Sequence, residues 1–180
     1  MPSAAERREQ ILARIARAAA LAKRDPADVR LIAVSKGRSA EEIAPLIEAG
    51  QGDFGENRVQ EAVAKWPNLL ARYPDLHLHA IGRLQSNKAA DAVKLFDEVH
   101  SVDRRSLLEA LVRESVKAGR IPRVYVQVNI GEEEQKGGCS IAETSGRSVR
   151  QAHVKARRGV STAIANVRSL CHDIAMGCLY

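Results

Sequence analysis

Aromatic residues are scarce in this sequence of 180 residues, and the marks of several protein classes are missing. Only 3% of the residues are Phe, Trp or Tyr, which disfavours modules that bind nucleic acid by stacking bases on aromatic rings. No apolar run approaches the roughly 18 residues that a membrane span requires. The first residues, MPSAAERREQ, lack the apolar core of a signal peptide. We therefore expect a cytoplasmic protein that binds neither nucleic acid nor a membrane.

Cysteine is also rare. The sequence contains three cysteines, at positions 139, 171 and 178. The number is odd and the spacing is unlike that of metal-binding cysteine pairs, which argues against both a disulfide framework and a zinc site. We expect no bound metal.

The net charge of +6 is concentrated near the C-terminus. Residues 140–180 hold six Lys or Arg and two acids, so +4 of the +6 belongs to them. A basic tail that engages nucleic acid is one hypothesis for this segment. A solvated tail is the simpler interpretation, because the aromatic residues that would support nucleic-acid binding are nearly absent.

The remaining sequence alternates between strand-like and helical segments. The pairs Ser3–Glu6 and Ser39–Glu42 are capping boxes, which predict helix starts. Pro67 is expected to end a later helix and Asp103 to cap another. Strand-like apolar segments begin near residues 30, 53, 77, 97 and 122.

Strands that alternate with helices predict a parallel sheet with right-handed crossovers. Each strand–helix unit uses about 20 to 25 residues, and an eight-fold barrel needs about 200 residues or more. The sequence after the fifth strand is too short for three further units. We therefore expect an α/β fold of the barrel kind that is incomplete at its C-terminal end.

A lysine stands at the end of the first apolar strand. The run Leu31–Val34 leads directly into Ser35 and Lys36, and a helix start follows. Functional sites of parallel α/β folds lie at the carboxyl ends of the strands. A lysine amine partly withdrawn from water can attack an aldehyde and form a Schiff base. Position alone also fits a solvated lysine at the beginning of a loop, and both interpretations stay open.

Five segments together resemble the pyridoxal phosphate homeostasis protein family, whose barrel is similar to the N-terminal domain of alanine racemase. The resemblance covers about residues 5–139. It implies a TIM-type (β/α) barrel of the alanine racemase N-terminal kind, with a pyridoxal phosphate-binding portion over residues 1–139. The segments, in chain order, are AVSKGRSAEEI, AGQGDFGENRVQEAVAKW, LHLHAIGRLQSNKA, EVHSVDR and VQVNIGEEEQKGG.

The resemblance assigns Lys36 as the lysine that holds pyridoxal 5′-phosphate as a Schiff base. It implies a non-catalytic protein of intracellular pyridoxal phosphate homeostasis, expected to be a monomer, which could pass the cofactor to apo-enzymes that need it. One alternative is a racemase-like enzyme, although such enzymes add a second β-domain for which this chain has no room. Another is a truncated family member without function.

Three further residues are candidates for the cofactor site. Asn57 follows the second strand and could face the cofactor, or it could cap the following helix. His79 could line the pocket, or it could be a hydrogen-bonded histidine of the barrel. Lys136 is a second amine after a strand end, but the acids beside it favour its protonated form.

The resemblance ends after residue 139. The loops that cradle the phosphate in the family are not recognisable in residues 140–180, which form a divergent basic tail. A shifted reading frame is one explanation. Genuine divergence is the other, with a helix over residues 160–174 that covers the open barrel.

Overall fold

The computed structural model describes residues 3–131 and 137–140 of the chain. Five strands form one sheet in the order β1-β2-β3-β4-β5, and every neighbouring pair is parallel. The strands are β1 (Ala33–Val34), β2 (Asp53–Glu56), β3 (His77–Ala80), β4 (Glu98–Val102) and β5 (Arg123–Val126). The helices are α1 (Ala4–Leu21), α2 (Ala40–Glu48), α3 (Val59–Arg72), α4 (Ala89–Leu95) and α5 (Arg105–Ala118), with short 3₁₀ turns η1 (Pro26–Asp28) and η2 (Ser86–Lys88).

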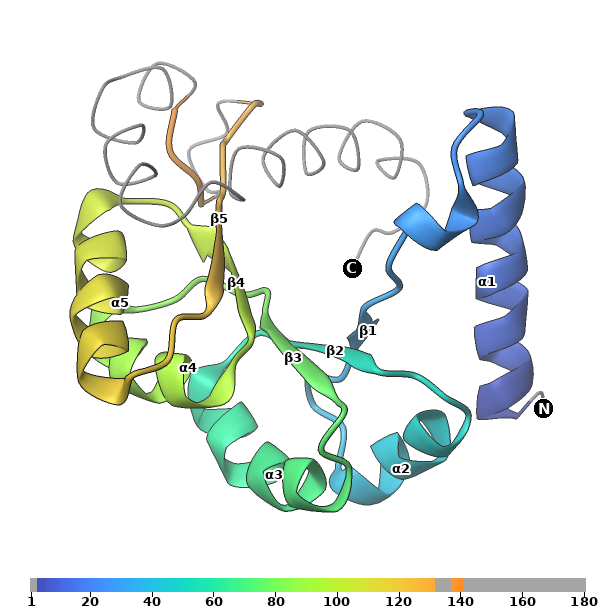
Figure 1. Ribbon diagram of the computed structural model, residues 1–180, viewed down its shortest axis with the longest axis horizontal. Coiled ribbons are helices and arrows are strands. Elements are labelled where there is room, and N and C mark those ends of the chain that lie inside the picture. The colour runs from blue at the N-terminus through green and yellow to red at the C-terminus, as the bar shows by residue number, and fades with distance from the viewer. Residues whose placement is uncertain (1–2, 132–136, 141–180) are drawn as a thin grey trace.

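The strands form a curved sheet with helices along its outer side (Figure 1). Helices α2 to α5 follow the sheet in chain order, and α1 lies beyond β1. In the described part of the chain β1 and β5 are the outer strands and do not pair with each other. The expected α/β fold of the barrel kind is thus confirmed, and the expected helix over 160–174 and Lys136 lie outside the described residues. Among the described helices, none has the length and apolar character that a membrane crossing demands.

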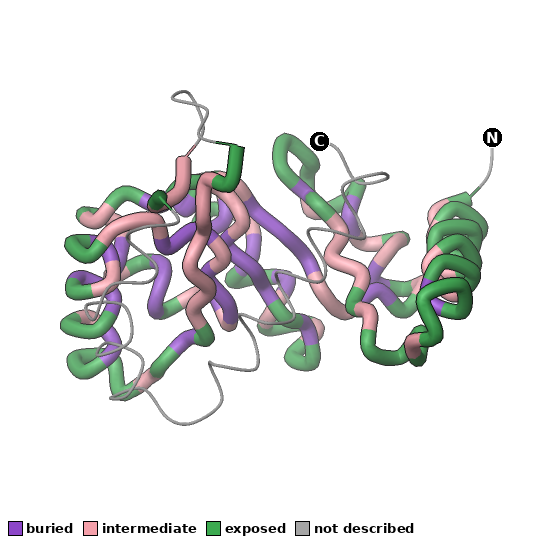
Figure 2. Tube along the Cα trace, turned by 90° about the horizontal axis from the view of Figure 1, so that it is seen from above, coloured by how far each residue is buried: buried purple, intermediate pink, exposed green. Residues whose placement is uncertain are grey.

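The hydrophobic core lies between the sheet and the outer helices (Figure 2). Phe54, Leu78 and Val99 point from adjacent strands into this layer and are fully buried. Trp66 of α3 packs against Phe54, with ring centroids 5.1 Å apart. Because side chains alternate along a strand, the residues between these apolar ones face the concave side of the sheet.

Both predicted capping boxes are present. The backbone N–H of Glu6 donates to the Ser3 hydroxyl, and the Ser3 N–H donates to the Glu6 carboxylate. Ser39 and Glu42 form the same reciprocal pair at the start of α2. Capping therefore fixes the beginning of the helix that follows the Lys36 loop.

Pro67 does not end α3, contrary to the prediction from sequence. The helix continues to Arg72. Proline removes the hydrogen bond to the carbonyl four residues earlier, here that of Val63. Pro67 and Val63 are both exposed, so water can satisfy that carbonyl and the helix persists.

Two other local predictions were also wrong. Asp103 does not cap α5, because its carboxylate binds the Arg104 guanidinium at 2.6 Å and lies 3.5 Å from Arg83 Nε. The first strand, expected over residues 30–35, is limited to Ala33–Val34. It is an outer strand with a single pairing partner, β2, which shortens the regular ladder.

Candidate functional site

Lys36 lies in the turn that follows β1, and its side chain is exposed. It makes no hydrogen bond or ion pair with any residue that the structure describes. Within the described part of the chain, Lys36 is therefore a solvated lysine at the start of a loop. In the described part of the chain β1 is an outer strand, and no further strand pairs with it beside the Lys36 loop.

The loop that carries Lys36 is held by α3. The Lys65 ammonium donates to the carbonyl oxygens of Ser35 at 2.9 Å and Arg38 at 3.0 Å. The backbone N–H of Gly37 donates to a carboxylate oxygen of Glu61. Backbone groups on both sides of Lys36 are thus tied to one helix, while its amine has no partner among the described residues.

A buried carboxylate anchors this arrangement. Glu56, at the end of β2, has no exposed side-chain surface, and its Oε1 lies 2.7 Å from Lys65 Nζ. The same oxygen accepts hydrogen bonds from Ser35 Oγ at 2.8 Å and Trp66 Nε1 at 2.9 Å. A buried carboxylate needs such partners, because taking an unpaired charge out of water is costly.

Sequence reasoning placed Glu56 at a strand end but missed Lys65 and the ion pair between them. The only local signal was the spacing of Glu61 and Lys65, which suits an ion pair across one helix turn and places their charged groups 3.8 Å apart. The Glu56 contacts join three separate elements, so no local pattern marks them.

Asn57 directly follows β2 and is half-buried. The residue at the N-cap of α3 is Arg58, which makes no side-chain capping bond. The alternative in which Asn57 caps the helix is therefore wrong. Its backbone packs tightly against the loop after β3: a Cβ added to Gly82 would lie 2.3 Å from the Asn57 carbonyl oxygen. Asn57 is thus placed at the same strand-end edge as Lys36.

A polar cavity of about 800 Å³ opens beside Asn57. Its walls are the start of α3, the loop before α4 and the start of α5. Four cationic side chains line it, those of Arg58, Arg83, Lys88 and Arg104. The uncharged Gln85, in the segment GRLQSNK, also lines the cavity. Gln85 stands at the N-cap of η2 without a side-chain capping bond. An excess of positive charge in a cavity attracts anions.

His79 lies deeper than Lys36, on the concave face of the sheet. It pairs in register with Gly55, which pairs with Val34, two residues before Lys36. The ring is fully buried, with Nε2 2.9 Å from Asp53 Oδ1 and Nδ1 3.1 Å from His100 Nε2. The structure therefore favours the hydrogen-bonded barrel histidine over a residue that lines the mouth.

The carboxylates around His79 set the local electrostatics. Burial lowers the pKa of His79, but hydrogen bonds with Glu98 and Asp53 raise it, and the net shift is upward. Burial also raises the pKa of Glu98, yet hydrogen bonds from His79 and Tyr125 bring it down to about 2. Burial and the charge on His79 lower the pKa of His100 to about 4. At neutral pH Glu98 is therefore ionised and His100 uncharged.

A parallel α/β sheet of this kind, with a lysine at the end of its first strand, is typical of the class of barrel proteins that bind ligands at the strand ends. Residues 7–166 match the family model described as "Alanine racemase, N-terminal domain", and the chain belongs to this family. The match runs past residue 139, where the resemblance of the motifs ends.

Within this family, the chain is similar to curated proteins named pyridoxal phosphate homeostasis protein. It is 44% identical to that of Pseudomonas aeruginosa over 141 residues, which cover 78% of this chain and 60% of the relative. It is 38% identical to that of Escherichia coli K12, over 74% of this chain and 58% of the relative. The resemblance stated from the motifs is thereby confirmed. The chain spans about three fifths of the length of these relatives.

Solved structures agree with this relationship. PipY of Synechococcus elongatus, solved without pyridoxal phosphate, is 43% identical and superposes with a TM-score of 0.66 over 77% of this chain and 63% of PipY. The structure of PipY with pyridoxal phosphate bound gives 45% identity and a TM-score of 0.61 over 72% of this chain and 60% of PipY.

Proposed function

We propose that this chain binds pyridoxal 5′-phosphate covalently through Lys36 and serves pyridoxal phosphate homeostasis without catalysing a reaction of its own. The observation that carries the proposal is the exposed Lys36 amine, which has no partner among the described residues, on a loop that Lys65 and Glu61 hold in place. The names of the curated relatives and the cofactor bound by PipY support it.

The residues at this edge suit the chemistry of the cofactor. When bound, pyridoxal phosphate supplies an aldehyde carbon that condenses with a primary amine. Lys36 offers that amine without a competing ion pair among the described residues. A fixed loop backbone reduces the conformational entropy that the attached lysine must lose. Asn57 stands at the end of the neighbouring strand β2, where its amide can hydrogen-bond a ring substituent.

The cofactor is also an anion. The cavity beside Asn57 carries an excess of cationic side chains, which favours the approach of a phosphate-bearing ligand to this edge of the sheet. We propose that these cations raise the rate of cofactor capture, and that apo-enzymes that require the cofactor are its recipients.

A racemase-like function is the rival. Catalysis would need an acid or base that touches the reacting atoms next to Lys36. In the described region His79 is fully buried against Asp53 and His100, so it does not act as an acid or base at the strand-end edge where Lys36 lies. A measurable racemisation of alanine by the cofactor-loaded protein would overturn the non-catalytic role.

The test is a titration of the full chain with pyridoxal phosphate, followed by borohydride reduction and peptide mapping. We expect a visible absorption band and a reduced adduct on the peptide that contains Lys36. Lys36→Ala should abolish both. Lys94→Ala, which removes an exposed lysine of α4, is the matched control and should retain them. An adduct on another lysine in the wild-type chain would overturn the assignment.

A further inference from the structure

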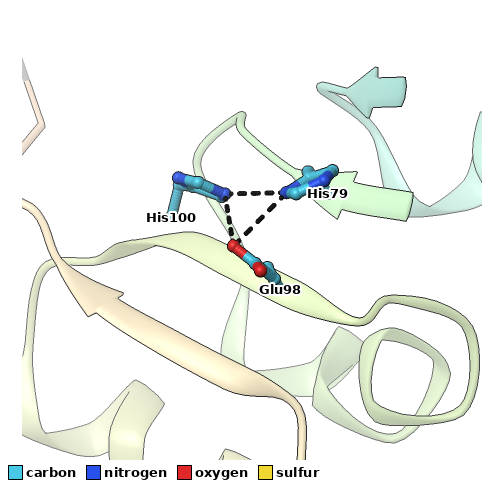
Figure 3. Close-up of side chains that lie close together, drawn as sticks. All are labelled: His79, Glu98 and His100. Carbon is cyan, nitrogen blue, oxygen red and sulfur yellow. Dashed lines mark hydrogen bonds and ion pairs between the residues drawn. The ribbon is translucent and has the colours of Figure 1, made fainter. Parts of the chain in front are cut away.

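Three side chains on the concave face of the sheet direct ligand atoms at one point (Figure 3). His79 comes from β3, and Glu98 and His100 come from β4. His79 Nδ1 lies 3.1 Å from His100 Nε2 and 3.5 Å from Glu98 Oε2, and His100 Nε2 lies 3.6 Å from the same oxygen. Two imidazole nitrogens and one carboxylate oxygen therefore form a nearly equilateral triangle.

The size of this triangle fits a metal ion. A point inside the triangle lies about 2.0 Å from all three atoms. This distance is about the length of zinc–nitrogen and zinc–oxygen bonds. The mean edge of about 3.4 Å also matches the edge of a tetrahedron whose metal–ligand bonds are about 2.1 Å. The triangle thus has the size of one face of a tetrahedral site.

The surroundings orient each ligand. His79 Nε2 lies 2.9 Å from Asp53 Oδ1. A carboxylate that accepts the far N–H is the usual second partner of a metal-binding histidine, because it fixes the orientation of the ring. When an ion binds, His79 Nδ1 releases its proton to solvent and offers its lone pair to the metal. The His100 ring stacks on Tyr125, with centroids 4.6 Å apart. The three ligands therefore need little rearrangement to bind an ion.

Two guanidinium groups oppose a cation here. Arg30 and Arg123 bind Glu98 Oε1 at 3.1 and 2.9 Å, which leaves Oε2 directed at the imidazoles. Their side chains are 52% and 56% exposed, so solvent screens part of their charge. Asp53 and Glu98 offset the remainder.

We propose that His79, Glu98 and His100 form a binding site for a divalent transition-metal ion of the zinc class. The donor set of two imidazoles and one carboxylate matches that class. The site is separate from the Lys36 amine and does not depend on the proposed cofactor. It also departs from the expectation of no metal, which rested on the cysteine pattern alone.

The test uses Co²⁺ as a spectroscopic probe on the full chain at fixed neutral pH, with cysteines alkylated beforehand so that thiolates do not bind it. We expect one equivalent of Co²⁺ to give the visible absorption of a tetrahedral site, and Zn²⁺ to remove it. His100→Gln should weaken Co²⁺ binding at least tenfold. His77→Gln, which changes an exposed histidine of β3, the strand that carries His79, should leave binding unchanged.

A second variant, Arg30→Gln, keeps the test decisive if His100→Gln does not fold. Arg30→Gln removes an opposing positive charge and should tighten Co²⁺ binding several-fold, an effect that a purely structural role of the cluster does not produce. Absence of a tetrahedral spectrum, equal binding by wild type and His100→Gln, or unchanged binding by Arg30→Gln would each overturn the proposal.

Discussion

The ammonium of Lys65 lies 2.7 Å from the carboxylate of Glu56 and also binds the carbonyl oxygens of Ser35 and Arg38. The pair is buried, with 9% and 0% of the two side chains exposed. It joins β2, α3 and the loop after β1 in one contact. A lysine of α3 thus holds the loop that presents Lys36.

Lys65→Met should destabilise the fold by about 3–5 kcal/mol, because removing one partner of a buried ion pair leaves the other charge uncompensated. It should also reduce borohydride trapping at Lys36, since the loop loses two backbone anchors. Urea unfolding measures the first effect and peptide mapping the second. Lys94→Met, on an exposed surface of α4, should change stability by no more than about 0.5 kcal/mol.

Glu56→Gln combined with Lys65→Met should recover part of that loss. The double variant removes both charges of this pair, so its free energy of unfolding should exceed that of Lys65→Met alone. If the double variant lost more free energy of unfolding than the two single variants lose together, the ion-pair account would be contradicted.

Trp66→Phe should lower the free energy of unfolding. The loss of the N–H that donates to Glu56 Oε1 at 2.9 Å should account for about 1–3 kcal/mol, in addition to the effect of the smaller ring. The ring packing against Phe54 is largely retained. Tyr73→Phe, which also removes one polar atom from an aromatic residue of the same region, is the control and should be close to neutral. Equal losses of unfolding free energy in the two variants would show that the Trp66 hydrogen bond does not contribute to stability.

Ser39→Ala should destabilise the protein by about 0.5–2 kcal/mol, because its hydroxyl accepts the N–H of Glu42, which has no partner within the helix. Ser106→Ala, on an exposed surface of α5, should have little effect. Thermal unfolding followed by circular dichroism compares them. A neutral Ser39→Ala would show that the capping box contributes nothing to the Lys36 loop.

Gly82→Ala should cost about 1–3 kcal/mol and weaken cofactor retention, because its Cβ would meet the Asn57 backbone at 2.3 Å and force the two loops apart. Gly52→Ala is the matched control, since a Cβ there meets nothing within 4 Å. Urea unfolding and a pyridoxal phosphate titration of both variants test the prediction. If Gly82→Ala retained pyridoxal phosphate as well as the wild type does, Asn57 would not be part of the proposed site.

Much of the fold follows from local patterns. The two capping boxes and the order of strands and helices are read from neighbouring residues, and the structure bears them out. Pro67 was misjudged because its effect depends on whether the freed carbonyl meets water, and that depends on which face of α3 packs on the sheet.

The sequence by itself determined the alternation of strands and helices, the parallel sheet and the placement of Lys36 at a strand end, because hydrophobic periodicity and capping are local properties of the chain. Only the tertiary structure decided that Lys65 holds the Lys36 loop and that His79, Glu98 and His100 meet. Those contacts depend on how α3 packs against β2 and on the register of β3 with β4, which residues distant in sequence set together.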